Sequence, residues 1–400
     1  MDPTTFPVVV ERAGDSWLAH TVGDAPSTRL LDWVRERPVP EGFRWEPGSR
    51  PIEPLGSASA PRNEACGSSS ARRGTSRAYR DADRTPRRSR GPLPQTLSSS
   101  ERKVGVDQTN HSVIVDNRAV VKWITVPLVG PHPAPERMRR LAAAGFAQLP
   151  AVWGTLEWRT PDGHWVPVAT AADLVADATD GWIWCLHEAR VALGIEPGPA
   201  LPFGGELGKL TADMHLALAD PINQSSNTET HHRSSSAEAP AQERPGRRSS
   251  SAEALAEERP SRPLVAVHGD FHVGQILRDP SGRLYVLDFD GNPTLTPDER
   301  VEHRPAAYDV AGMLLSLENV GYVVRKYDPE IPEQSVADWT AAVQQEFLDA
   351  YRARAGHLLD DSLLDAYADD QIQRELDYAH DHLPEWRYVP EAALRRRGRL

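Results

Sequence analysis

The sequence has few cysteines, no long apolar run and no excess of basic charge. Its two cysteines, Cys66 and Cys185, cannot form a disulfide framework, so we expect a reducing compartment, the cytoplasm. The sequence contains no run of about 18 apolar residues, the length that spans a membrane as a helix. The N-terminus lacks the basic and apolar regions of a signal peptide. Because 45 Lys and Arg stand against 57 Asp and Glu, the net charge is −12, which disfavours binding to nucleic acid. We therefore expect a cytoplasmic protein with neither a membrane nor a nucleic acid as its partner.

Two stretches contain almost nothing that could build a core. Residues 56–100 are rich in Ser, Arg, Pro and Gly and form a basic island in an acidic chain. Residues 221–263 contain a tandem repeat, in which RSSSAEAPAQERPGR is followed at once by RSSSAEALAEERPSR. Ser, Glu, Arg and Pro bury little apolar surface, and two copies are too few for a solenoid. We expect both stretches to be disordered insertions in a smaller folded protein.

The remaining sequence predicts an α+β protein with two lobes. Residues 1–55 would form a small N-terminal cap, 101–173 a strand-rich N-lobe, and 174–400 a mostly helical C-lobe that contains one strand pair near 264–289. Strands early in the chain and helices later are typical of this fold class. The expected local elements before the C-lobe are a strand at 8–10, a helix at 28–37, a hairpin of 112–115 with 119–123, a helix at 135–146, and strands at 152–158 and 165–169.

The stretch from 264 to 293 carries the residues best suited to chemistry. An apolar run ends in the HGD sequence at Asp270, and a second apolar run, 284–287, ends at Asp288. A turn between them predicts that two paired strands deliver both acids to one end of a small sheet. Asp270 could accept a proton from an attacking hydroxyl. Gln275 and Asp288 offer an amide oxygen and a carboxylate to a hard cation such as Mg²⁺, which needs few protein oxygens when phosphates supply others.

This spacing resembles the protein-kinase superfold, in which a catalytic Asp is followed by a metal-binding amide and then by an Asp-Phe-Gly sequence. HGD stands here in place of His-Arg-Asp, Gln275 in place of Asn, and Asp290 in place of Gly. The HGD pattern is similar to that of the aminoglycoside phosphotransferase-like branch, whose members act on small molecules. An unrelated hydrolase with acidic strand ends is the alternative, but three residues in register with two strands disfavour it.

The resemblance also implies a lysine that holds the phosphates of ATP. Lys122 alternates with apolar residues on the second strand of the expected hairpin, and Glu136 at the start of the next helix would orient it. No glycine-rich loop precedes the hairpin, so polar side chains such as Thr109 and Ser112 would help to cover the phosphates. Taken alone, Lys122 would more readily be an ordinary solvated strand residue.

Longer segments narrow the resemblance. HGDFHVGQILR, VLDFDGNP and YDVAGMLLSLE look like the maltokinase and glucosamine kinase group of actinobacteria, and the similarity covers most of the chain from 105 to 390. In that group Asp309 would support the catalytic loop or contact the sugar. A helix N-cap is the alternative role for this residue.

One helix near the C-terminus bears on the choice of sugar. Its residues at i, i+3, i+4 and i+7 share a face and are Gln371, Arg374, Glu375 and Tyr378. Together with Trp386 just beyond them, they suit a polyhydroxylated ligand, although a solvated face with an ion pair is the alternative. The Gln-x-x-Arg-Glu pattern followed by Leu-Pro-x-Trp resembles the glucosamine kinase subgroup, in which Glu375 would face the substrate ammonium.

The resemblance thus implies an ATP- and Mg²⁺-dependent kinase that phosphorylates D-glucosamine on its 6-hydroxyl. Its expected partners are a small-molecule sugar and ATP, and its expected state is a monomer. Three alternatives stay open: a maltokinase, an aminoglycoside phosphotransferase, and a catalytically dead pseudokinase that acts as a binding module. The joint presence of Lys122, Asp270, Gln275 and Asp288 disfavours the last of these.

Overall fold

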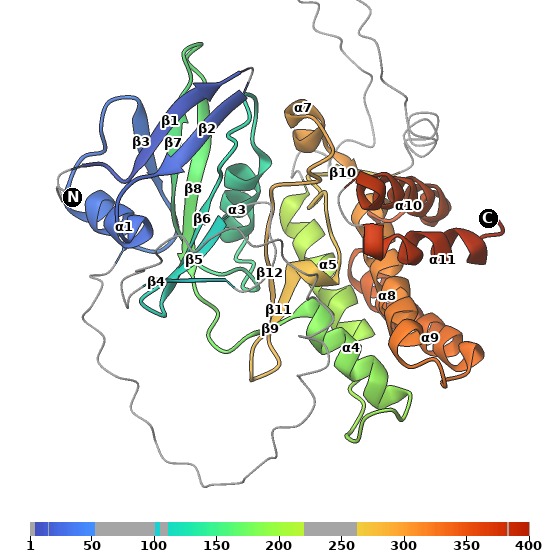
Figure 1. Cartoon of the computed structure of the whole chain (residues 1–400). Coiled ribbons are helices and arrows are strands. Elements are labelled where there is room, and N and C mark those ends of the chain that lie inside the picture. Colours follow the sequence, from blue (N-terminus) through green and yellow to red (C-terminus); the bar gives the residue numbers. More distant parts are fainter. Residues whose placement is uncertain are drawn as a thin grey trace, which may run out of the picture.

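The computed structural model describes residues 5–14, 16–52, 101–104, 111–219, 262–381 and 384–399. Thr109 and most of both expected insertions, 56–100 and 221–263, lie outside these residues. The described chain forms a β-rich N-lobe beside a mostly helical C-lobe (Figure 1), which confirms the predicted two-lobed α+β architecture.

The N-lobe is built on a six-stranded sheet whose neighbouring strands all run antiparallel. Its hairpin turn has Asp116 and Asn117 in the left-handed region, at φ 52° and 51°, as the sequence predicted for this polar turn. The strands, in sheet order, are β3 (Phe43–Pro47), β7 (Val152–Arg159), β8 (Trp165–Asp173), β6 (Ala119–Trp123), β5 (His111–Val115) and β4 (Glu101–Lys103).

The expected N-terminal cap is continuous with this lobe. Strands β1 (Val8–Ala13) and β2 (Ser16–Thr21) form a hairpin, helix α1 (Pro26–Glu36) follows, and β3 then joins the six-stranded sheet. Apolar side chains of the cap, such as Leu30 and Leu31, are fully buried in one cluster with Val121 and Leu156 of the sheet. The cap and the sheet therefore share a single core.

The C-lobe is a helical assembly around a larger apolar core. Helix α5 (Gly204–Leu218) packs tightly on α9 (Glu333–Ala355): a Cβ added to Gly204 or Gly208 would lie only 2.4 or 2.2 Å from a carbonyl oxygen of α9. The helices are α4 (Gly181–Ala192), α5 (Gly204–Leu218), α7 (Pro297–Val301), α8 (Ala307–Tyr327), α9 (Glu333–Ala355), α10 (Leu364–Asp381) and α11 (Tyr388–Arg396), with single 3₁₀ turns η2 (Val273–Gln275), η3 (Asp361–Leu363) and η4 (Pro384–Trp386).

The strand pairing expected inside the C-lobe is wrong in one respect. The run before Asp270 forms only a short strand, β10 (Leu264–Val265), which pairs with β13 (Arg304–Pro305). Strand β12 (Leu284–Val286) pairs instead with β11 (Ile276–Arg278), and β9 (Thr179–Asp180) adds to β11. The chain between 268 and 275 is thus free to form the loop that carries Asp270, and the tight turn at 279–283 joins strands that are adjacent in sequence.

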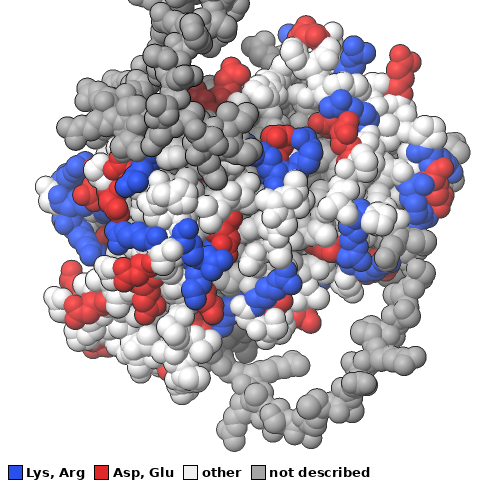
Figure 2. All heavy atoms as spheres, turned by 180° about the vertical axis from the view of Figure 1, so that it is seen from behind, with Lys and Arg blue, Asp and Glu red and all other residues white. Residues whose placement is uncertain are grey.

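Two further properties of the described residues are the apolar length of the helices and the distribution of charge on one face of the molecule. None of the described helices is long and apolar enough to cross a membrane. On the face shown in Figure 2, basic and acidic side chains are interspersed rather than gathered by sign.

Deleting residues 221–260 is expected to preserve the fold. Ala219 and Val265 already form a β-bridge, so the few residues left between them can close the gap. Loop entropy varies only with the logarithm of length, so the free energy of unfolding should change by no more than about 2 kcal/mol. Urea unfolding of the deleted and full-length chains would measure this, and a deleted chain that cannot fold would contradict the expectation.

Candidate active site

The loop that follows β10 carries Asp270, the predicted base, and the buried carboxylate of Asp309 holds this loop in place. Asp309, at the start of α8, accepts hydrogen bonds from the backbone N–H groups of His268 (2.6 Å) and Gly269 (2.9 Å) and contacts His215 Nε2 (3.1 Å). Burial alone would raise the pKa of Asp309, but these hydrogen bonds hold it below the ordinary value. Asp309 is therefore a positioning residue, and because its side chain is buried the predicted contact with the sugar is wrong.

The electrostatic environment of Asp270 suits a general base. Desolvation, followed by the negative charge of Asp288, raises the pKa of Asp270 to about 7, although Arg374 acts in the opposite direction. A base is most effective when its pKa lies near the working pH. The structure thus brings Asp288 and Arg374 within electrostatic range of Asp270.

Asp288, which acts on Asp270 electrostatically, has a constrained backbone conformation. Its φ of 59° is in the left-handed region, and its side chain is 41% exposed. The next residue, Phe289, is buried with its ring 4.7 Å from that of His268. His268 Nε2 lies 2.8 Å from the carbonyl oxygen of Leu287. These contacts tie the Asp288 segment to the catalytic loop.

Gln275 is placed beside Asp288 by a backbone hydrogen bond, in which Leu287 N–H donates to the Gln275 carbonyl at 2.8 Å. Its amide nitrogen lies 3.3 Å from His272 Nε2, which leaves the amide oxygen for another partner. The described residues contain no cluster of three or more His, Cys, Asp or Glu side chains able to hold a metal. One amide and one carboxylate nevertheless fit a Mg²⁺ ion that takes its remaining oxygens from phosphates and water.

Lys122 has different partners from those predicted. Its Nζ lies 2.6 Å from Asp288 Oδ1 and 2.6 Å from Asp290 Oδ2. Glu136 does not reach it: this side chain is 58% exposed and pairs with Arg139 on its own helix, α3 (Pro133–Ala143). The predicted Lys122–Glu136 pair is wrong because α3 turns Glu136 outward. Ser112 lies opposite Lys122 in the hairpin register, and its role toward the phosphates stays a prediction.

The polar face of α10 adjoins the same site at three of its predicted positions. Glu375 accepts hydrogen bonds from Asn319 Nδ2 and Gln371 Nε2, both at 3.3 Å, and Arg374 donates to Gln371 Oε1 at 2.8 Å. Desolvation raises the pKa of Glu375 to about 7. The two hydrogen bonds to Glu375 lower this pKa, and the negative charge of Asp270 raises it. Glu375 is thus within electrostatic range of Asp270.

The other two predicted sugar residues are more exposed. Tyr378 is 38% exposed, and Trp386 is 37% exposed in η4 with its ring beside that of Tyr388, at 6.3 Å. Their part in sugar binding stays a prediction.

Two buried polar atoms near α10 have no hydrogen-bond partner among the described residues, Tyr308 Oη and Asn319 Oδ1. The guanidinium of Arg374 lies over the Tyr308 ring, 5.5 Å from its centre, and Asn319 contacts Glu375. A buried polar atom without a partner costs free energy that a bound ligand can recover. Sequence inspection missed both residues, because only the packing of α8 buries these polar side chains next to the site.

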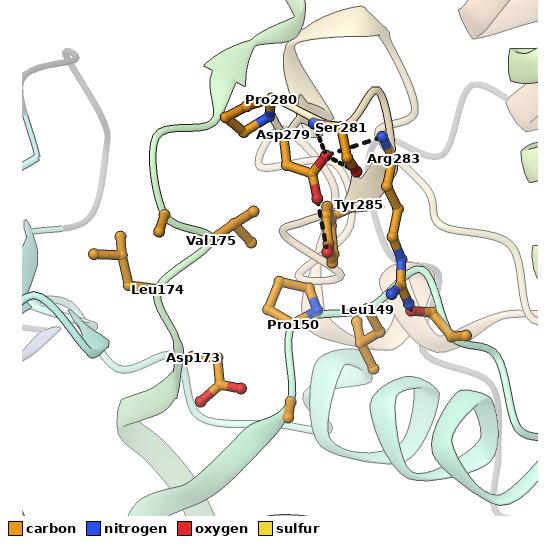
Figure 3. A pocket seen from close by; sticks show the side chains of 13 residues that line it. Leu149, Pro150, Asp173, Leu174, Val175, Asp279, Pro280, Ser281, Arg283 and Tyr285 are labelled. Carbon is orange, nitrogen blue, oxygen red and sulfur yellow. Dashed lines mark hydrogen bonds between the residues drawn. The ribbon is translucent and has the colours of Figure 1, made fainter. Parts of the chain in front are cut away.

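A separate cavity of about 580 Å³ lies where the lobes join (Figure 3). Leu174 and Val175 of the interlobe segment line one side of it, and the turn between β11 and β12 lines the other. In this turn Asp279 accepts hydrogen bonds from the Ser281 N–H and the Tyr285 hydroxyl. None of the predicted catalytic, metal-binding or sugar-binding residues lines this cavity, so we do not place the reaction there.

The chain is similar to a family of phosphotransferases and to glucosamine kinases of known sequence and structure. The model of the "Phosphotransferase enzyme family" matches residues 132–357. A glucosamine kinase of Mycolicibacterium smegmatis is 38% identical over 319 residues, which cover 74% of this chain and 78% of that protein. A glucosamine kinase of Streptacidiphilus jiangxiensis is 40% identical over 332 residues, covering 76% and 74%. A solved glucosamine kinase in complex with glucosamine, ADP and inorganic phosphate is 29% identical, with a TM-score of 0.66 over 97% of this chain and 90% of that one.

Proposed function

This chain belongs to the phosphotransferase enzyme family, and from that premise we propose that it transfers the terminal phosphate of ATP to the 6-hydroxyl of glucosamine. It is a kinase of the glucosamine kinase group and acts on a sugar hydroxyl. The observation that supports the choice of glucosamine is the 38% and 40% identity to two glucosamine kinases, and the position of Asp270 near Asp288 and Glu375 supports its role as the base.

The geometry supports a division of labour between the lobes. Asp270 would accept a hydrogen bond from the sugar hydroxyl, align it and take its proton during transfer. Lys122 would turn from its carboxylate partners to the phosphates of ATP. Asp288 and Gln275 would hold Mg²⁺, which neutralises phosphate charge when bound. The N-lobe, 101–173, would thus serve the nucleotide, and the C-lobe, 174–400, the sugar and the base.

Sugar recognition would rest on α10. Glu375 would meet the 2-ammonium of glucosamine, while Asn319 Oδ1 and the Tyr308 hydroxyl would gain partners from the sugar. The buried Cys185 and the need for ATP support a cytoplasmic enzyme, and we take the monomer as its working state.

Purified protein should consume ATP fastest with glucosamine in a panel that also contains glucose, maltose and kanamycin. The readout is ADP release at saturating Mg²⁺, with product identity checked by the position of the phosphate on the sugar. Faster turnover of maltose or kanamycin than of glucosamine would replace the proposed substrate.

Changing Glu375 to Gln is expected to remove most of the preference for glucosamine over glucose. A charge-assisted contact with the ammonium is worth about 1.5–3 kcal/mol, or about 10–100-fold. The wild-type enzyme should therefore show a glucosamine-to-glucose ratio of kcat/KM in that range, and Glu375→Gln should bring the ratio close to one. N-acetylglucosamine should be nearly inert with both proteins, because acetylation removes the charge and adds bulk.

The matched control is Asp377→Asn, which makes the same chemical change on an exposed position of α10 where the side chain pairs with Gln373. It should leave the ratio unchanged. If Glu375→Gln keeps the wild-type ratio, α10 does not sense the amine, and the basis for choosing glucosamine is lost.

A further inference from the structure

Helix α3 belongs to the N-lobe in sequence but packs with the core of the C-lobe. Its buried apolar residues, Ala134 and Leu141, are members of the C-lobe apolar cluster and not of the cluster beneath the six-stranded sheet. Arg137 lies between them at i+3 from Ala134, on the same helix face. An arginine on an apolar face is unusual, so its buried head group needs specific partners.

Those partners are three backbone carbonyls from three different segments of the C-lobe. Arg137 Nη1 donates to the carbonyl oxygens of His268 and Phe289, both at 2.9 Å, and Nη2 donates to that of Arg300 at 2.6 Å. The side chain is only 3% exposed. Desolvation lowers the pKa of Arg137 to about 10, which still leaves the group protonated at neutral pH. One cation therefore joins the loop of Asp270 to the segment of Asp288.

One glycine in each of these two segments leaves room for the guanidinium of Arg137. Gly269 and Gly291 have φ of +88° and +75°, and their Cα atoms face one another closely enough that a Cβ on Gly269 would lie 3.2 Å from Gly291 Cα. A Cβ on Gly291 would lie 3.4 Å from Arg137 Nη1. Both positions favour glycine on conformational grounds, and both lie directly beside the head group.

We propose that Arg137 is the positioning residue that sets the distance between the base and the metal-binding carboxylate. The planar guanidinium can donate to several carbonyls at once in a fixed geometry, which a lysine ammonium cannot reproduce. This inference rests on the proposed function only for its kinetic consequences.

The test compares Arg137→Lys and Arg137→Ala with Arg139→Lys and Arg139→Ala. Arg139 lies on the same helix but is exposed and pairs with Glu136, so its variants carry the same change away from the site. Arg137→Lys should lower kcat for glucosamine by about 10–100-fold with KM for the sugar little changed, because small displacements of reacting groups cost about this much. Guanidinium ion added at millimolar concentration should restore part of the kcat of Arg137→Ala and leave Arg139→Ala unaffected.

A second readout does not depend on turnover. Amide hydrogen exchange in the segments 268–270 and 289–291 should become faster in Arg137→Lys than in wild type or in Arg139→Lys, while exchange in α9 stays the same. Wild-type kcat and wild-type exchange in Arg137→Lys would overturn the inference. So would a loss of activity in Arg137→Ala that is explained by unfolded protein alone, with the folded fraction fully active.

The two ideas fail separately. If wild-type protein does not phosphorylate glucosamine, the proposed function is wrong, and the exchange data still decide the role of Arg137. If wild-type protein phosphorylates glucosamine and the Arg137 variants behave like the Arg139 variants in both measurements, only the role of Arg137 is wrong.

Discussion

Asp270→Asn is expected to lower kcat by about 10²–10⁴-fold, the usual effect of losing a positioned general base. The amide keeps the size of the carboxyl group but cannot accept a proton from the sugar hydroxyl, and it aligns that hydroxyl less well. The nucleotide should bind almost as tightly as in wild type, because Asp270 is not among the groups assigned to ATP. The expected result is therefore an enzyme that binds its substrates and does not turn them over.

The pH dependence supplies a second test of the same assignment. Because burial and Asp288 raise the pKa of Asp270 to about 7, the base is protonated, and inactive, below that pH. Wild-type kcat/KM for ATP, which reports on the free enzyme, should fall as the pH drops through 7. The residual activity of Asp270→Asn should lack the part of this decline that belongs to Asp270.

Both measurements use steady-state kinetics, with ADP binding followed by calorimetry as the check that the variant is folded. Turnover of Asp270→Asn within a few-fold of wild type would show that another group acts as the base.

Asp288→Ala is expected to reduce turnover by at least about 10³-fold and to raise the Mg²⁺ concentration needed for half-maximal activity. The change removes a carboxylate ligand for the cation, and a cation that neutralises phosphate charge contributes several kcal/mol to phosphoryl transfer. It also removes one of the two carboxylates on Lys122, which keeps Asp290 at 2.6 Å. Gln275→Ala should be milder, because water can replace a neutral amide oxygen.

Titrating Mg²⁺ at fixed ATP distinguishes these variants. Asp298→Ala is a suitable control, since it removes an exposed carboxylate ten residues further along the chain. Identical Mg²⁺ curves for wild type and for Asp288→Ala, measured on the residual activity of the variant, would remove Asp288 from the metal site. A Gln275→Ala effect as large as that of Asp288→Ala would mean that the amide does more than fill a coordination position.

Features with a local cause could be predicted from the sequence. The 116–118 turn joins two strands because Asp and Asn tolerate left-handed backbone. A proline stands in the first turn of α3 because its missing N–H costs nothing there, although the helix begins at Pro133, two residues before the predicted start. The spacing of Asp270 and Asp288 likewise predicted two carboxylates close together, and the structure brings them within electrostatic range of one another.

Features that depend on how distant elements face one another were decided only by the tertiary structure. The sequence could not show which way α3 turns, so Glu136 was expected at Lys122, and Arg137, one residue later and about 100° further round the helix, was missed. An arginine at i+3 from one apolar residue and i−4 from another was the available signal. For Asp309 the resemblance implied either support of the loop or contact with the sugar, and its burial beside the loop decides for support. Sequence periodicity identifies a helix and its apolar stripe, but the contacts of each side chain are set by the neighbours that packing brings to it.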